Sequence, residues 1–152
     1  MKWIFGLVVA AVFLTACAQT SILEESAPFE ELVDGSCNSA ESRLVQEHIS
    51  GQIAALSKED WESAYSFAAP GFQEIVGLDQ FIFVITSQYQ MLISNDSVEY
   101  GACDIAEKEI SQEVRVTSEN EIYKLTYSLS VTSEKLGIES ASVTISEPQT
   151  NI

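Results

Sequence analysis

The strongest constraint on the fold is a change in the spacing of apolar residues along the chain. Between residues 44 and 92 they recur every three or four positions, which is the period of an amphipathic helix. Beyond residue 95 they alternate with polar residues, and the alternation is clearest over residues 122–133. Helical segments followed by alternating segments predict an α+β fold in which helices pack on an antiparallel sheet.

Three helices are expected in the first half of the chain. The first carries an apolar stripe over residues 44–56. Ser57 with Asp60 three residues later resembles a capping box, and this pair predicts the start of the second helix. Pro70 and Gly71 are expected to end that helix, because proline removes a backbone donor. The third helix is expected over residues 79–92, after a short piece at 72–77.

About four strands are expected after the helices, joined by polar turns. They lie at 96–102, at 109–117, at 122–133 and around 141–145. In the third of these strands the inward row is Tyr123, Leu125, Tyr127, Leu129 and Val131, and in the last it is Ala141, Val143 and Ile145.

From about residue 43 to the last expected strand, roughly two thirds of its length, the chain also resembles a bacterial protein family, known as domain of unknown function 4864. Its members share the segment Q-x-x-A-x-x-x-x-D-x-x-x-A-Y/F-x-x-A-x-P, then a phenylalanine at the head of the third helix and a tyrosine near its end. The matching residues are Gln52, Ala55, Asp60, Ala64, Tyr65, Ala68, Pro70, Phe81 and Tyr89. The chain departs from the family where members carry a tryptophan in the last strand, since Lys135, Leu136, Gly137 and Ile138 stand near that place. The family is similar to nuclear-transport-factor-2-like proteins, so the resemblance implies a cone: three helices closing one side of a curved sheet of about four strands.

The first residues have the pattern of an export signal. Residues 1–16 carry one charge, Lys2, followed by an apolar run too short for a bilayer, which needs about 20 such residues. The small residues ahead of Cys17 resemble a lipobox, in which the signal is cut before the cysteine and the thiol carries a diacylglycerol. The alternative is ordinary secretion with a cut before Gln19, which predicts a soluble periplasmic or secreted protein.

Composition divides the remainder into two parts. Residues 17–36 are expected to be a lipidated N-terminus and an acidic flexible linker, and residues 37–152 a single α+β domain. Loss of Lys2 with the signal leaves six bases against 23 acids, a formal charge of −17. Such a surface repels phosphate groups, so nucleic acid is excluded as a partner, and attachment to the membrane is expected through the lipid instead.

The other two cysteines, Cys37 and Cys103, are expected to form a disulfide if the chain is exported, or to remain two separate thiols. A metal site is not expected, because the cysteines lie far apart and His48 is the one histidine. No motif calls for a cofactor.

The resemblance implies a pocket between helices and sheet, where enzymes of that superfamily use acid and tyrosine side chains to move protons. Five residues are candidates here: His48, Asp60, Tyr65, Tyr89 and Tyr127. Each also has a structural interpretation: Asp60 as a helix-start residue, His48 as a packed histidine, and the three tyrosines as core aromatics. An enzyme would need several of them to converge.

Three functions are therefore compatible with the sequence. The first is a non-catalytic envelope lipoprotein whose domain binds a small apolar ligand or another envelope protein. The second is a small pocket enzyme with isomerase-like or hydrolase-like activity. The third is an assembly or stability factor that uses the outer sheet face or a homodimer interface. Fold alone decides none of these.

Overall fold

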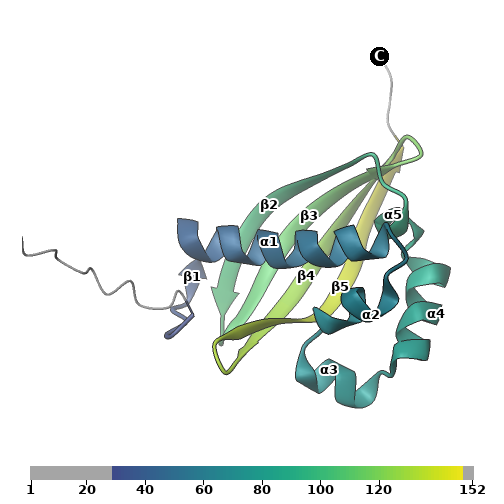
Figure 1. Cartoon of the computed structure of the whole chain (residues 1–152). Helices are drawn as coiled ribbons and strands as arrows, with labels where there is room; N and C mark the ends of the chain where they lie inside the picture. Colours follow the sequence, from purple (N-terminus) through teal and green to yellow (C-terminus); the bar gives the residue numbers. More distant parts are fainter. Residues whose placement is uncertain (1–28, 149–152) are drawn as a thin grey trace, which may run out of the picture.

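Residues 29–148 are described by the structure, a computed structural model, and they form helices that precede and cover an antiparallel sheet (Figure 1). The predicted signal peptide and Cys17 lie outside the described residues. In chain order the elements are β1 (Gly35–Ser36), α1 (Ser39–Leu56), α2 (Trp61–Ser66), α3 (Pro70–Ile75), α4 (Leu78–Gln88), α5 (Gln90–Ile93), β2 (Ser97–Ala106), β3 (Glu109–Ser118), β4 (Glu121–Thr132) and β5 (Lys135–Pro148). The predicted α+β class is confirmed.

Helix α1 lies across one face of the sheet (Figure 1). It begins at Ser39, ahead of the predicted stripe, because Asn38 forms a capping box: its side chain accepts the N–H groups of Ala40 and Glu41, and the Glu41 carboxylate accepts the N–H of Asn38. The apolar face of the helix is then fully buried. Its members are Val45, Ile49, Ile53 and Leu56.

The sheet has five strands in the order β1-β2-β3-β4-β5, with every neighbouring pair antiparallel. The number of strands exceeds the predicted four because the two-residue β1 pairs with the end of β2. A spacing pattern cannot reveal a strand this short. Alternation places one row of each central strand under the helices. The buried members are Ile110, Gln112, Val114 and Val116 in β3, and Leu125, Tyr127 and Leu129 in β4.

Two of the predicted helix boundaries are wrong. Ser57 ends α1, where its hydroxyl donates to the Ala54 carbonyl, and Asp60 alone caps α2 by accepting the Ser63 N–H at 3.2 Å. Pro70 does not merely stop a helix: it occupies the first turn of α3, where a missing N–H is harmless.

The predicted third helix is also two helices. Tyr89 separates α4 from α5 with a backbone at φ −125° and ψ 38°, outside the helical region. Its hydroxyl donates to the carbonyl of Ala141 in β5. This tertiary contact accompanies the break, and the spacing of apolar residues in the sequence does not predict the break.

Strand β5 is longer than the predicted segment around 141–145. Its register against β4 is irregular next to Ser128 and again next to Lys124, which is typical of bulges on an edge strand. Val143 stands opposite Leu125 as expected for an inward residue, yet it is 41% exposed because β5 is the outermost strand.

The packed body begins inside the predicted linker. Phe29 is buried, and Gly35 and Ser36 pair with β2. The predicted disulfide is present: Cys37 is bonded to Cys103, whose carbonyl also accepts the Cys37 N–H at 2.9 Å. Closing a loop of 66 residues stabilises the fold by about 4 kcal/mol in the chain-entropy model.

The helical layer is tied to β5 by backbone hydrogen bonds. Ile138 donates to the Phe67 carbonyl and accepts from the Ala69 N–H, both at 2.9 Å, so that Ala68 and Ile138 form a parallel bridge. Gly137 permits this approach, because a Cβ on it would lie 2.5 Å from the Ala69 Cα. We call residues 67–69 with Gly137 and Ile138 the backbone bridge.

Gly137→Ala is expected to lower the free energy of unfolding by about 1–3 kcal/mol, because the added methyl group meets backbone that cannot move without breaking the bridge. Urea denaturation followed by circular dichroism would measure it. Gly71→Ala is the matched control: nothing lies within 4 Å of its Cβ position in α3, and alanine favours helix, so this variant should be at least as stable as the native chain. Equal midpoints for the two variants would contradict the close approach at Gly137.

Candidate functional site

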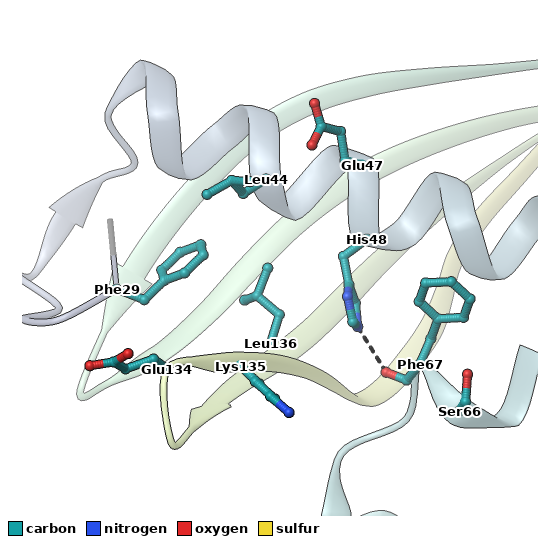
Figure 2. A pocket seen from close by; sticks show the side chains of 9 residues that line it. All are labelled: Phe29, Leu44, Glu47, His48, Ser66, Phe67, Glu134, Lys135 and Leu136. Atoms are coloured by element: carbon teal, nitrogen blue, oxygen red, sulfur yellow. Dashed lines mark hydrogen bonds between the residues drawn. The ribbon is translucent and has the colours of Figure 1, made fainter. Parts of the chain in front are cut away.

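Two hollows lie on either side of the backbone bridge. The first, the α1 groove, is an open hollow of about 570 Å³ between α1 and the start of β5 (Figure 2). It is lined by Phe29, Leu44, Glu47, His48, Ser66, Phe67, Glu134, Lys135 and Leu136. The second, the α4–β5 cavity, is smaller, at about 180 Å³.

The α1 groove combines apolar side chains with charges of both signs. Phe29 and Phe67 lie toward its two ends in Figure 2, with His48 between them, while Glu134 and Lys135 belong to the side opposite α1. Its acids are not clustered: Glu47 pairs with Arg43 on the exposed surface of α1 at 3.2 Å. An open groove with opposed charges is a weak candidate for a selective small-molecule site.

His48 is the polar centre of the groove. Its Nε2 lies 2.9 Å from the Phe67 carbonyl, and its ring meets the Phe67 ring edge-on at 5.1 Å between centroids. A carbonyl oxygen only accepts, so Nε2 must carry the proton, and the Phe67 carbonyl then accepts from both His48 and Ile138. Burial lowers the pKa of His48, and the bond to Phe67 opposes part of that shift. The histidine thus stabilises the backbone bridge through its hydrogen bond to the Phe67 carbonyl.

The α4–β5 cavity lies between α1, α3, α4, α5 and β5, and its walls are mostly apolar. The apolar lining consists of Ala68, Phe72, Phe81, Val84, Ile85, Tyr89, Leu92, Ile138 and Ala141. Three polar residues complete it: Gln52 from α1, and Glu139 and Ser140 from β5. Ser140 is exposed and Glu139 half-buried, so these two mark the side toward solvent, whereas Gln52 is 5% exposed and lies inside.

The walls are fixed by hydrogen bonds as well as by packing. The Tyr89 hydroxyl donates to the Ala141 carbonyl and closes α4 against β5. The Tyr65 hydroxyl donates to the carbonyls of Val76 at 2.6 Å and Gln73 at 3.3 Å, which holds α3 beside α2, and its ring packs 5.5 Å from that of Phe81. The aromatic walls are therefore preorganised.

The five sequence candidates do not converge on one site. His48 lies in the α1 groove and Tyr89 in the wall of the α4–β5 cavity. Tyr65 ties α2 to α3, and Asp60 is an exposed helix cap whose pKa is lowered by the hydrogen bonds from Ser63. Tyr127 is fully buried in β4, where burial raises the pKa of its hydroxyl.

Gln52 lines the α4–β5 cavity but is not among the five candidates chosen from the sequence. It stands on the buried stripe of α1, where a polar side chain is a signal, but nothing in the sequence shows what it faces. Its Nε2 lies 3.4 Å from the Ala64 carbonyl in α2.

Residues 29–148 offer no group of three or more histidine, cysteine, aspartate or glutamate side chains arranged to hold a metal ion. Over the same part of the chain, no helix has the length and apolarity needed to cross a membrane.

Helices packed on one face of an open antiparallel sheet, with an apolar cavity where the last strand meets the helical layer, define a two-layer α+β protein. The chain belongs to the family described as domain of unknown function 4864, whose model matches residues 38–150. That match runs from the Asn38 cap of α1 through all of β5. Comparison with the curated proteins found no match. Comparison with the solved structures found none either, and the likeness to nuclear-transport-factor-2-like cones stays a prediction.

His48 should make stability depend on pH. Because its folded pKa lies below the ordinary 6.5, the unfolded chain takes up a proton first, and stability should be lost as pH falls below about 6.5. His48→Gln can still donate to Phe67 but does not titrate, so its free energy of unfolding should vary less between about pH 7.5 and pH 5.5. Urea denaturation across this pH range would measure the free energy of unfolding of the native chain and of the variant. An unchanged slope in the variant would show that other groups set the dependence.

Proposed function

We propose that this chain is an exported envelope lipoprotein whose folded domain binds a small apolar ligand in the α4–β5 cavity without catalysing a reaction. The observation that carries this proposal is the cavity itself. It is concave, of about 180 Å³, and walled by aromatic and aliphatic side chains with few polar groups. Small-molecule sites have this composition, and an apolar cavity of about 150 Å³ in another protein is known to hold a benzene ring.

The residues that carry the family resemblance support this choice of site. Gln52, Ala68, Phe81 and Tyr89 line the cavity directly. Three of the remaining five members build the elements around it, since Asp60 caps α2, Pro70 begins α3, and Tyr65 packs against Phe81. The pattern therefore describes the cavity and its scaffold more closely than it describes the α1 groove.

A binding role fits the chemistry of the cavity better than an acid–base role. Catalysis by proton transfer needs a titratable group within reach of a second one. The Tyr89 hydroxyl is bonded to a backbone carbonyl, and Glu139 on the solvent side accepts from the Ser130 hydroxyl at 2.6 Å. Neither group is hydrogen-bonded to a second titratable group among the described residues that line the cavity.

The lipoprotein part of the proposal rests on the first 17 residues. They carry Lys2, an apolar run and small residues ahead of Cys17. The Cys37–Cys103 disulfide accords with an oxidising compartment. Residues 18–28 would then separate the lipid from Phe29, where the packed body begins, and the domain would face the periplasm or the exterior.

Small aromatic molecules such as toluene are expected to stabilise the protein. Ligand at ten times its Kd should add about 1.4 kcal/mol to the free energy of unfolding, which a thermal shift assay detects. Val84→Phe should abolish the shift by filling the cavity from α4. The control is Phe83→Ala on the same helix: Phe83 is 67% exposed and outside the cavity lining, so this variant should respond as the native chain does. A response that survives Val84→Phe would place the ligand elsewhere.

Intact mass of the protein extracted from membranes tests the anchor. The native chain should carry a diacylglycerol-sized addition that Cys17→Ser lacks, because the thiol is the attachment point. Alkylation should label two cysteines only after reduction, Cys37 and Cys103. A mass that fits an unlipidated chain beginning at Gln19 would instead indicate a freely diffusing exported protein.

A further inference from the structure

We propose that the α4–β5 cavity selects apolar ring molecules that carry one hydrogen-bond donor, and that the Gln52 carbonyl oxygen recognises this donor. The inference rests on the proposed function and adds the class of ligand. A phenol is the simplest member of that class: a single ring matches the cavity volume of about 180 Å³, and its hydroxyl supplies the donor.

The orientation of the Gln52 amide follows from its neighbour. The Ala64 carbonyl lies 3.4 Å from one end of the amide, and a carbonyl accepts but cannot donate. The end that faces it is therefore Nε2, which leaves Oε1 directed away from α2.

The Gln52 oxygen has no partner within residues 29–148. No described residue donates a hydrogen bond to Oε1, although the residue is only 5% exposed. Two other side-chain oxygens, Gln112 Oε1 and Tyr127 Oη, also lack partners, but those two are fully enclosed in protein. Gln52 Oε1 differs because it is not fully enclosed and its residue lines the cavity. A buried acceptor that keeps access to a cavity favours a ligand with a donor.

The other polar groups of the cavity already have a hydrogen bond or lie toward solvent, although their oxygens can still accept. The Tyr89 hydroxyl donates to the Ala141 carbonyl, and Ser140 is exposed on the solvent side. Glu139 is also on that side and accepts from Ser130, so the Gln52 oxygen is the inner acceptor that has no bond to a described residue. A ring with one donor can therefore place its apolar part against Phe72 and Phe81 while the donor reaches the inner amide.

The test compares phenol with toluene, which have nearly the same shape but differ in the donor. Phenol is better hydrated than toluene, so the informative quantity is the ratio of the toluene Kd to the phenol Kd, measured once in the native protein and once in Gln52→Met. This variant has a similar side-chain volume but no amide. Isothermal titration calorimetry should give a ratio about ten-fold lower in the variant than in the native protein. Gln46→Met, at a half-buried position of α1 outside the cavity lining, should keep the native ratio.

A second measurement does not depend on how the variant folds. In native protein, phenol should shift the NMR signal of the Gln52 side-chain carbonyl carbon, and toluene should shift it much less. Equal ratios in native and Gln52→Met protein, or equal shifts with both probes, would overturn the inference while leaving the proposed function intact. If neither probe binds at all, both proposals are wrong.

Discussion

The fold depends on one short contact between two segments that lie about 70 residues apart in sequence. The backbone bridge joins the end of α2 to the start of β5 through two hydrogen bonds at Ile138, and it can form only because Gly137 lets the Ala69 backbone approach. Helix α1 is already held to the sheet by its buried stripe, but α2, α3 and α4 extend past the edge strand in Figure 1. The bridge covers the outer edge of β5 between the end of α2 and the start of α3, so it satisfies backbone groups of an edge strand and fixes the helical layer at the same time.

Both hollows follow from this arrangement. On one side of the bridge, the start of β5 faces α1 and leaves the groove that contains His48; on the other, Ile138 and Ala141 face α4 and leave the apolar cavity. The Phe67 carbonyl connects the two, since it accepts from Ile138 and lies beside the His48 Nε2. The groove is open and carries opposed charges, whereas the cavity is smaller and mostly apolar, and the bond from Tyr89 to β5 holds one of its walls in place. The cavity therefore suits the proposed small-molecule site better than the groove does, because a ligand there would lose more contact with water.

Sequence patterns predict those parts of this structure that depend on local spacing. The alternation in β3 and β4 and the stripe of α1 correspond to buried rows, and the Cys37–Cys103 pair forms as expected. The features that escape prediction depend on distant partners. The pairing of β1 needs β2, and the break at Tyr89 accompanies its bond to Ala141. The same limit applies to the site: Tyr89 and His48 can be named as candidates from residue type, but only the folded chain shows that they belong to different hollows.

Two buried glutamines show why residue type and burial do not by themselves define a functional residue. Gln112 in β3 donates from Nε2 to the carbonyls of Gly101, Ala102 and Glu113, where the register between β2 and β3 shifts next to Tyr100. Its amide replaces ladder hydrogen bonds that the irregular strand cannot make, so its role is structural. Gln52 makes one long bond to Ala64, and its residue borders the cavity. Neither amide oxygen has a partner among the described residues, so the free acceptor alone does not separate the two. The difference is that Gln112 satisfies several backbone groups inside the sheet, whereas Gln52 makes one bond and borders an apolar cavity, where its acceptor is better placed for a ligand.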